Sequence, residues 1–292
     1  MFGLLNIDKP AGITSRDVVN RVQRLVRPHK VGHAGTLDPL ATGVLIVAIG
    51  PATRLVEYIQ RMPKTYQGTF LLGRTSNTED VEGAVVELPN AAVPMREEIL
   101  AAIPRFLGTI EQRPPAFSAL KIAGRSAYKL ARRGEAIELA PRPVEIHAID
   151  LLGYQYPELE LRVRCGSGTY IRSLARDIAE SLGTGAVMSG LRRLAIGPFA
   201  VVDAIGCDNL SGPTIEANMR PPLMAVAGLP QIVLSNEQIA CVSRGQTFSA
   251  AYDQAADEVA AVDTGGRLIA ILKPAGDGEL APSKCLIERP ER

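Results

Sequence analysis

The stretch His33-Ala-Gly-Thr-Leu-Asp-Pro-Leu-Ala-Thr-Gly-Val-Leu-Ile-Val-Ala-Ile-Gly50 holds a single carboxylate, Asp38, among small residues. It begins in a loop rich in Gly and Pro, over residues 28–43, and ends in the apolar run 44–49. A short apolar run between turn residues is typical of a buried strand. The stretch therefore predicts a strand that enters the core directly after a loop carrying one acid.

The chemistry open to a lone acid is limited. A glycoside hydrolase needs a second carboxylate close in space, and no other loop presents an acid in similar surroundings. Phosphoryl transfer would need Mg²⁺ and further acids, and a P-loop would need Gly-Lys-Ser/Thr; residues 28–50 offer neither. Two interpretations remain: Asp38 attacks or deprotonates at an electrophilic carbon, or Asp38-Pro39 simply forms a turn.

The composition is that of an ordinary globular protein, with 46% apolar and 22% charged residues over 292 positions. This length predicts one large domain, or a large domain with a small one. The first residues lack the basic and apolar segments of a signal peptide, and no run reaches the roughly 18 apolar residues of a membrane span. We therefore expect a cytoplasmic protein with no membrane partner.

The spacing of possible ligands argues against a metal site. The chain has three histidines, at 29, 33 and 147, and four cysteines without a Cys-x-x-Cys pair, at 165, 207, 241 and 285. Because structural zinc needs clustered ligands, we expect no metal, and free thiols that are buried or partly buried.

Two amphipathic patterns predict helices. After Thr14 or Ser15, one apolar face runs to a helix end before Pro28, formed by Val18, Val19, Val22, Leu25 and Val26. A second helix is expected over about 170–182, stopped by Gly183. Alternation over 64–72 and 159–165 predicts strands, so that the fold class is mixed α/β.

The tail differs from the rest of the chain. Residues 228–292 hold six Lys and Arg against nine Asp and Glu, a net charge of −3, whereas the remainder carries +4. Ser235-Asn-Glu-Gln238 fits a capping box, and residues 258–262 and 267–273 flank Asp-Thr-Gly-Gly, a hairpin signal. After a linker over 219–224, we expect a small, mostly β module.

Six segments together resemble one family. Gly32-His-Ala-Gly-Thr-Leu-Asp-Pro-Leu-Ala-Thr-Gly-Val-Leu45 closely resembles the active-site signature of the TruB family of tRNA pseudouridine synthases. The others agree in order along the chain: Asn6-Ile-Asp-Lys-Pro-Ala-Gly-Ile-Thr-Ser15, Lys64-Thr-Tyr66, Arg113-Pro-Pro-Ala-Phe-Ser-Ala-Leu-Lys121, Gly166-Ser-Gly-Thr-Tyr-Ile-Arg172 and Leu191-Arg-Arg-Leu194. The resemblance covers about residues 3–200, and the tail resembles the PUA-type RNA-binding module of the family.

The resemblance implies a fold and a reaction. The fold would have a central, largely antiparallel mixed sheet with a catalytic cleft, in a catalytic domain over 1–225, followed by a PUA-like domain over 228–292. The reaction would convert uridine 55 in the T-loop of tRNA to pseudouridine, without cofactor or metal, after the base is flipped out. The base leaves ribose C1′, turns, and rejoins through C5, so that one carboxylate suffices. Asp38 would act as a nucleophile on the sugar or as the base that removes the C2′ proton, and the sequence leaves both routes open.

The resemblance also assigns roles within the site. Arg172 matches an arginine that pairs with the catalytic Asp and would keep it ionised and oriented. Tyr66 matches a tyrosine that stacks on the target base and takes part in removing the C5 proton. Tyr170 is expected to hydrogen-bond in the site, and Leu191 to form an apolar wall. On the residues alone, Arg172 also fits a surface position at a helix start, and Tyr66 a core position on a strand.

Basic residues are expected to contact RNA. The resemblance gives His33 an RNA contact in preference to acid–base catalysis, and makes Arg54 a phosphate contact or a structural pair. Residues 113–140 resemble a thumb-like loop that closes over RNA. Its candidate phosphate contacts are Lys121, Arg125, Lys129, Arg132 and Arg133, with Arg192 and Arg193 as similar candidates elsewhere; the alternative for each is a solvated surface.

Two other functions remain open at this point. One is an RNA-folding factor whose catalysis is incidental, and the other is a guide-RNA-dependent relative that works in a ribonucleoprotein. The insertion at 113–140 and the small C-terminal module favour a stand-alone enzyme. For that enzyme we expect the T-arm stem-loop of tRNA as partner, no obligatory protein partner, and a monomer.

Overall fold

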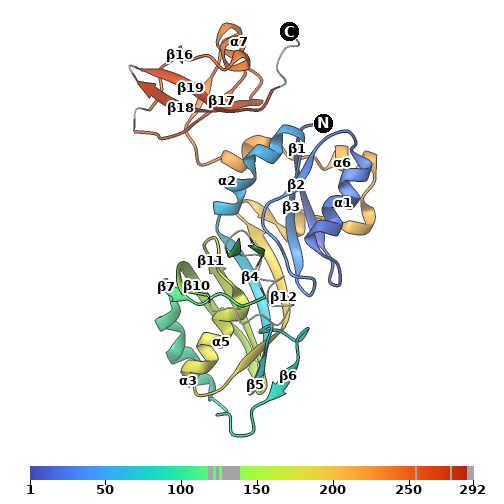
Figure 1. Ribbon diagram of the computed structural model, residues 1–292, viewed down its shortest axis with the longest axis vertical. Helices are drawn as coiled ribbons and strands as arrows, with labels where there is room; N and C mark the ends of the chain where they lie inside the picture. The colour runs from blue at the N-terminus through green and yellow to red at the C-terminus, as the bar shows by residue number, and fades with distance from the viewer. Residues whose placement is uncertain (118–120, 123–124, 127–138, 254, 277, 288–292) are drawn as a thin grey trace.

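The computed structural model describes residues 1–117, 139–253, 255–276 and 278–287, together with the backbone of 121–122 and 125–126. The molecule is elongated (Figure 1). Two lobes share one ten-stranded sheet: the first is built on the strands within 3–49 and 205–206, the second on those within 64–72 and 108–165, and the strand over 186–196 lies between them. A C-terminal unit with a five-stranded sheet of its own lies at one end.

The large sheet has the strand order β14-β1-β3-β12-β4-β11-β10-β7, with β2 on β3 and β13 on β12. Its neighbours run antiparallel except β1 with β14 and β3 with β12. The prediction of a largely antiparallel mixed sheet is therefore confirmed. The strands are β1 (Gly3–Lys9), β2 (Val31–His33), β3 (Thr42–Ile49), β4 (Lys64–Leu72), β7 (Gly108–Gln112), β10 (Arg142–Gln155), β11 (Glu158–Cys165), β12 (Ala186–Ile196), β13 (Phe199–Ala200) and β14 (Ile205–Gly206).

Helices cover the faces of this sheet where the apolar patterns predict them. Thr14 caps α1 in a capping box with Asp17, and Val22 is fully buried. Leu25 was expected on the buried face but is 41% exposed, because it lies in the last turn at the edge of that face. Among the described residues, the helices of the two lobes are α1 (Ser15–Leu25), α2 (Val56–Arg61), α3 (Arg96–Ala102), α5 (Ile171–Ser181) and α6 (Gly212–Ala217), and the 3-10 turns are η1 (Gly50–Leu55), η2 (Ile103–Phe106), η3 (Val201–Asp203), η4 (Cys207–Asn209) and η5 (Pro222–Val226).

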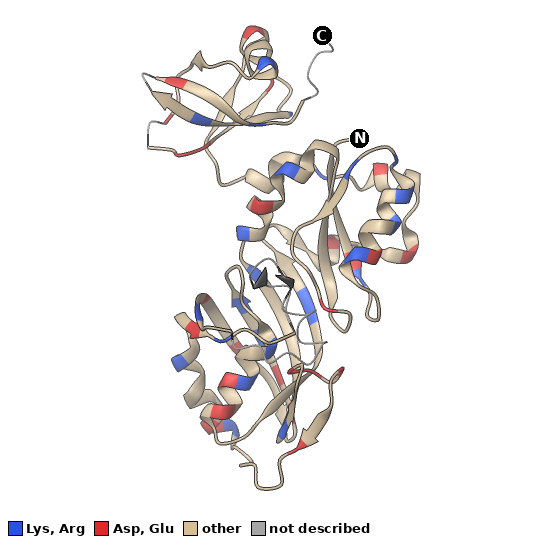
Figure 2. Cartoon of the chain, in the orientation of Figure 1, with Lys and Arg blue, Asp and Glu red and all other residues tan. Residues whose placement is uncertain are grey.

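Two short hairpins extend from the second lobe. β5 (Arg74–Ser76) pairs with β6 (Val85–Glu87), and β8 (Lys121–Ile122) pairs with β9 (Arg125–Ser126) inside the expected thumb segment. Figure 2 shows Lys and Arg interspersed with Asp and Glu over the described parts of both lobes and of the C-terminal unit. In the part of the chain that the structure describes, no helix is long and apolar enough to cross a membrane.

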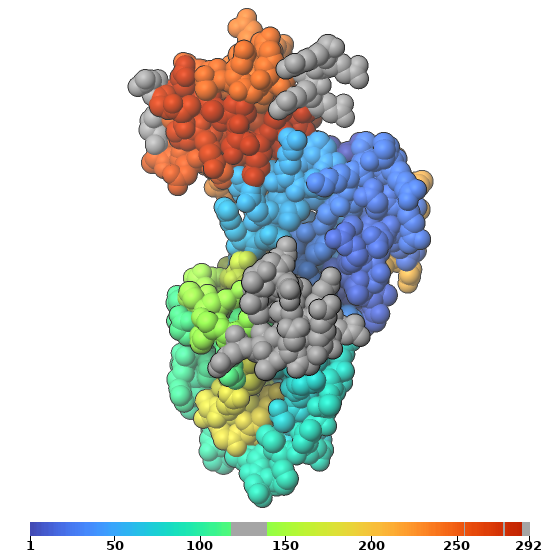
Figure 3. All heavy atoms as spheres, in the orientation of Figure 1, coloured from blue at the N-terminus to red at the C-terminus, as the bar shows by residue number. Residues whose placement is uncertain are grey.

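The C-terminal unit packs directly on the first lobe (Figure 3). The predicted capping box and hairpin are confirmed at α7 and at the β17–β18 pair. Residues 219–224 were expected to be a linker, but Arg220 pairs with Leu4 of β1 and Pro222 is buried, since this segment completes the core beside the sheet. The elements of the unit are β15 (Gln231–Val233), α7 (Asn236–Arg244), β16 (Phe248–Ser249), β17 (Val259–Val262), β18 (Leu268–Gly276) and β19 (Glu279–Cys285).

The two lobes meet where β3 and β12 pair over two residues only, Thr42 with Arg192 and Gly43 with Arg193. Gly43 has φ +96°, a conformation that L side chains rarely adopt. A Cβ at this position would lie 2.8 Å from the Arg193 nitrogen and closer still to its carbonyl oxygen. The close approach of the two backbones therefore requires glycine and places the Asp38 loop over the junction.

We predict that Gly43→Ala destabilises the protein by more than about 2 kcal/mol, because the strained φ and the clash with the Arg193 backbone add. Gly108→Ala is the matched control, since Gly108 has φ +81° but a Cβ added there would meet no atom within 4 Å. It should lose only about 1 kcal/mol. Urea unfolding measures both, and equal losses would show that the close approach at the junction is unimportant.

Candidate active site

The loop between β2 and β3 holds Asp38 in place through its neighbours. The Leu37 N–H donates to Ser15 Oγ (2.9 Å), and the Ser15 hydroxyl donates to the Leu37 carbonyl (3.1 Å). The buried Lys9 ammonium donates to the Pro39 carbonyl (3.3 Å). These contacts fix the backbone on both sides of Asp38, so its carboxylate is presented in one direction.

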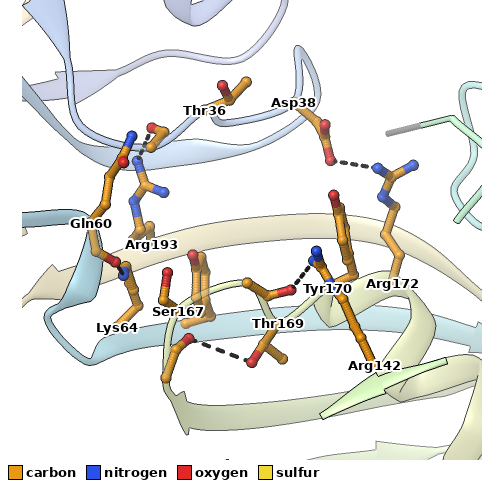
Figure 4. A pocket seen from close by; sticks show the side chains of 14 residues that line it. Thr36, Asp38, Gln60, Lys64, Arg142, Ser167, Thr169, Tyr170, Arg172 and Arg193 are labelled. Carbon is orange, nitrogen blue, oxygen red and sulfur yellow. Dashed lines mark hydrogen bonds and ion pairs between the residues drawn. The ribbon is translucent and has the colours of Figure 1, made fainter. Parts of the chain in front are cut away.

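Asp38 also forms the turn that its sequence permits. The Ala41 N–H donates to the Asp38 carbonyl (3.1 Å), which closes a turn over Asp38-Pro39-Leu40-Ala41. The side chain, however, points away from this turn and into a cavity of about 300 Å³ (Figure 4). The Asp38 backbone therefore forms the turn, while its side chain lines the cavity.

The cavity draws its walls from distant parts of the chain. Its volume lies at the lower end of the range for small-ligand sites. β4, β10, β12, the start of α5 and the Asp38 loop all contribute, so the cavity exists only where the two lobes meet. The charged and aromatic side chains that line it are Asp38, Lys64, Tyr66, Arg142, Tyr170, Arg172 and Arg193.

Arg172 is a buried cation, with 5% of its side chain exposed, and its guanidinium contacts four groups, one through an ion pair and three through hydrogen bonds. Two are carboxylates, of Asp38 (3.2 Å) and of Asp80 (3.1 Å). The others are the carbonyls of Thr78 (2.7 Å) and Phe117 (3.2 Å). A buried charge is tolerated when it is paired and its donors are satisfied, and this arrangement meets both conditions while it orients Asp38.

Asp80 is a second carboxylate that the sequence did not single out, since residues 79–83 indicate only a turn. Its side chain is 4% exposed. It accepts hydrogen bonds from the Thr78 hydroxyl (2.6 Å) and the Glu82 N–H (3.1 Å) as well as from Arg172. Asp80 therefore accepts hydrogen bonds from protein groups. It pairs with Nη1 of Arg172, whereas Asp38 pairs with Nη2.

The surroundings of Asp38 raise its pKa above the ordinary value of 3.8. Burial by the walls of the cavity is the main cause, although the side chain keeps 37% of its surface exposed toward the open side. Arg172 lowers the pKa, and the negative charge of Asp80 raises it again. Asp38 is therefore a more basic carboxylate than a solvated one, held beside a cation that favours its ionised form.

Tyr66 forms part of the cavity wall from the buried face of β4. Burial raises the pKa of its phenol, so the hydroxyl stays protonated at neutral pH. The Arg193 guanidinium lies 6.0 Å from the centre of the ring. The ring is therefore uncharged, and the stacking and proton-removing roles expected for Tyr66 both stay predictions.

Arg193 was expected to be a phosphate contact, and this is wrong because the side chain is 2% exposed. Its Nε donates to the Val44 carbonyl (2.7 Å) and Nη2 to the Gly35 carbonyl (3.1 Å), so it ties β12 to both ends of the Asp38 loop. Arg192 remains partly exposed and pairs with Asp8 (2.8 Å).

Lys64 is a further cavity residue that the sequence motifs did not mark as functional. It lies two positions before Tyr66 on the same buried face of β4, and the strand alternation could have revealed it. Its ammonium donates to the Gln60 carbonyl. Burial lowers its pKa to about 8, with a smaller contribution from Arg193.

Three of the predicted substrate contacts lie outside the cavity lining. His33 ends β2, and burial, with the charge of Arg16, lowers its pKa, so the imidazole is neutral at neutral pH. Leu191 packs against the core cluster that contains Tyr66. Arg54 donates to the Cys285 carbonyl of the C-terminal unit, which corresponds to the structural-pair alternative.

The thumb candidates are only partly within the described chain. Lys121 and Arg125 lie on the β8–β9 hairpin, whose backbone alone is described. Lys129, Arg132 and Arg133 lie outside the described residues. Within the described residues, no group of three or more His, Cys, Asp or Glu side chains is arranged to hold a metal ion.

Comparisons with known proteins identify the family. Residues 23–171 match the model of the TruB family pseudouridylate synthase (N terminal domain), and residues 172–220 match the tRNA pseudouridylate synthase B C-terminal domain. The chain belongs to the TruB family. Proteins named tRNA pseudouridine synthase B from Gluconacetobacter diazotrophicus and Arthrobacter sp. are 42% and 41% identical to it, over 97% and 94% of both chains respectively. The Acaryochloris marina protein of the same name is 44% identical over 80% of this TruB family chain and 81% of its own.

Solved structures give the same fold at lower identity. The crystal structure of a Cbf5-Nop10-Gar1 complex contains a chain that is 27% identical, with a TM-score of 0.76, over 99% of this chain and 86% of that one. A structure of an H/ACA RNP bound to a substrate RNA containing 2′-deoxyuridine gives 26% identity and a TM-score of 0.73 over the same shares. The alignments to these two structures thus cover nearly the whole length of this TruB family chain.

We predict that the Asp38 carboxyl titrates above pH 3.8, and that Asp80→Asn lowers its midpoint. The substitution removes a negative charge that opposes ionisation of Asp38, so the ionised form persists to lower pH. The measurement is a ¹³C NMR titration of the Asp38 carboxyl carbon. Asp208→Asn, at a side chain 97% exposed, is the control and should leave the midpoint unchanged. An unchanged or raised midpoint in Asp80→Asn would contradict this account of the site.

A second prediction concerns the geometry of Arg172. Arg172→Lys keeps the charge but cannot make three hydrogen bonds and the ion pair with Asp38 at once, so we expect the free energy of unfolding to fall by about 2 kcal/mol or more. Arg162→Lys, at an exposed position on β11, should change it by less than about 0.5 kcal/mol. Urea unfolding compares the two variants, and a neutral Arg172→Lys would mean that charge alone matters.

Proposed function

We propose that this TruB family protein converts uridine 55 in the T-loop of tRNA to pseudouridine. The observation that carries the proposal is the Asp38–Arg172 pair, 3.2 Å apart at the wall of a cavity between the two lobes. Residues that match the family motifs, Asp38, Tyr66, Tyr170 and Arg172, line this one cavity. A target inside a folded RNA loop must be flipped out to enter it.

The arrangement suits a reaction that breaks and remakes one glycosidic bond. Arg172 keeps Asp38 ionised and directed into the cavity, where it acts on the sugar as a nucleophile or removes the C2′ proton. Asp80 is engaged by Arg172, Thr78 and the Glu82 N–H, so it is not placed as the second, water-activating carboxylate of an inverting glycosidase. Detached uracil is thereby favoured to rejoin the ribose.

The remaining expectations belong to the same proposal. Residues 1–225 form the catalytic domain with a thumb over 113–140, and residues 228–292 form a PUA-like RNA-binding domain. The enzyme works as a cytoplasmic monomer without an obligatory protein partner. Support for the division into domains comes from the family matches over 23–171 and 172–220 and from the separate five-stranded sheet of the tail.

The other two functions are less well supported. A pure RNA-folding factor has no need of a paired, partly desolvated carboxylate with a raised pKa. A guide-dependent enzyme is favoured only by fold likeness at 26–27% identity, whereas the named tRNA enzymes reach 41–44%.

The test is tritium release from unmodified tRNA carrying [5-³H]uridine, followed by mapping of the modified position. We expect release by the wild-type protein at one T-loop uridine, and a loss of at least about 10²-fold in Asp38→Asn, because the reacting carboxylate is gone. Asp208→Asn serves as control and should match wild type. Tight tRNA binding without any release by the wild-type protein would instead support the folding-factor function.

A further inference from the structure

The two ends of the thumb segment meet at one residue pair of the sheet. β7 ends at Gln112 and β10 begins at Arg142, and the two residues are directly opposite each other in the antiparallel ladder. Both side chains reach the same residue, Tyr170, which immediately precedes α5 and lines the cavity. The thumb therefore leaves and re-enters the sheet beside a wall of the cavity. We call this residue pair, Gln112 and Arg142, the neck of the thumb.

Gln112 holds the backbone of Tyr170. The Tyr170 N–H donates to Gln112 Oε1 (2.8 Å), and Gln112 Nε2 donates to the Tyr170 carbonyl (3.0 Å). Gln112 is completely buried, so both ends of its amide depend on these two bonds. Tyr170 has no side-chain cap of its own at the start of α5. The Gln112 side-chain amide thus bonds both backbone groups of Tyr170 and holds Tyr170 in place.

Arg142 holds the ring of Tyr170. Its guanidinium carbon lies 5.2 Å from the ring centre, within the range of a cation–π contact. Its Nη2 also donates to the Gly168 carbonyl (2.6 Å), which fixes the guanidinium plane (Figure 4). Among the described residues, no carboxylate forms an ion pair with Arg142. Its interactions are therefore directed at the ring and at the loop that leads to it.

The same neck also contacts the helix that carries Arg172. The Tyr170 carbonyl accepts from the Leu174 N–H (3.0 Å), so its position sets the first turn of α5, in which Arg172 lies. Just inside the thumb, the Phe117 carbonyl accepts from Arg172 and the Arg113 carbonyl accepts from Arg176 (3.0 Å). The base of the thumb and the site are thus held by one set of bonds.

We propose that Gln112 and Arg142 are positioning residues for Tyr170, and that the neck of the thumb thereby sets the tyrosine wall of the reaction cavity. The proposal deepens the proposed pseudouridine synthase function and rests on it for its rate measurement. The competing role for Arg142 is a direct contact to an RNA phosphate, since it is a cation at the edge of a cavity.

The test separates these roles by a double-mutant cycle with Arg142→Met, Tyr170→Leu and the double variant. The quantities measured are the single-turnover rate of tritium release at saturating tRNA, and the tRNA dissociation constant at several salt concentrations. We expect Arg142→Met to lower the rate about 10-fold with tRNA affinity nearly unchanged, and to have almost no effect when Tyr170 is already Leu. Arg105→Met, at an exposed position in η2, is the matched control and should behave as wild type.

A companion variant tests the backbone clamp. Gln112→Glu has the same shape but sets a second acceptor against the Tyr170 carbonyl, so we expect a similar fall in single-turnover rate and, in thermal unfolding, a lower midpoint. The Arg142 cycle keeps the proposal testable if this variant does not fold, because Arg142 is not fully buried.

Four outcomes would contradict the positioning role or the proposed function. Additive effects of Arg142→Met and Tyr170→Leu would overturn the positioning role. Weaker tRNA binding with a salt slope reduced by about one and an unchanged saturated rate would establish Arg142 as a phosphate contact instead. If the wild-type protein releases no tritium, the proposed function itself fails. If the wild-type protein does release tritium and Arg142→Met releases it at the same rate and binds tRNA equally well, only the positioning role fails.

Discussion

The shared guanidinium of Arg172 is the interaction on which the site depends. It brings together a loop from the first lobe, a turn after β5, and the base of the thumb, through Asp38, Asp80 and the Phe117 carbonyl. Each segment has backbone contacts of its own, such as the bridge between Asp80 and Met188, and Arg172 adds the side-chain contacts that join the three. Because a buried cation is costly when unpaired, the fold and the acidity of Asp38 are linked: whatever moves Arg172 changes both.

The sheet provides the frame in which that cation can be buried. β3 and β12 touch over two residue pairs, so the two lobes diverge on either side and leave room for a cavity. Gly43 permits the backbones to approach, and Arg193 ties the Asp38 loop to β12 from beneath. A longer parallel ladder at this place would have closed the space that the proposed reaction needs.

Much of this could be predicted from local sequence. The apolar run 44–49, the alternation over 64–72 and the helix start at Thr14 or Ser15 depend on near neighbours, and the structure bears them out, with Thr14 as the cap. The motif residues Asp38, Tyr66 and Arg172 were also expected to lie together. Asp80 and Gln112 were not recognised, and Arg193 was given another role, because each acquires its place through partners 58 to 158 residues away in the chain. A turn, a strand end and a pair of basic residues have no distinctive local pattern, so their roles become visible only once those partners are known. Leu25 shows that the apolar pattern of a helix does not predict where its buried face ends.

Helix α2 lies between the C-terminal unit and the cavity. Glu57 pairs with Lys284 of the C-terminal unit, while Gln60, three residues on, lines the cavity. One short helix therefore lies between the tail and the cavity and contributes to the spacing between them. Under the proposed function, a tRNA that contacts both must span this interval with its own fold, which makes the interval a second criterion for the substrate beside the base that is flipped out.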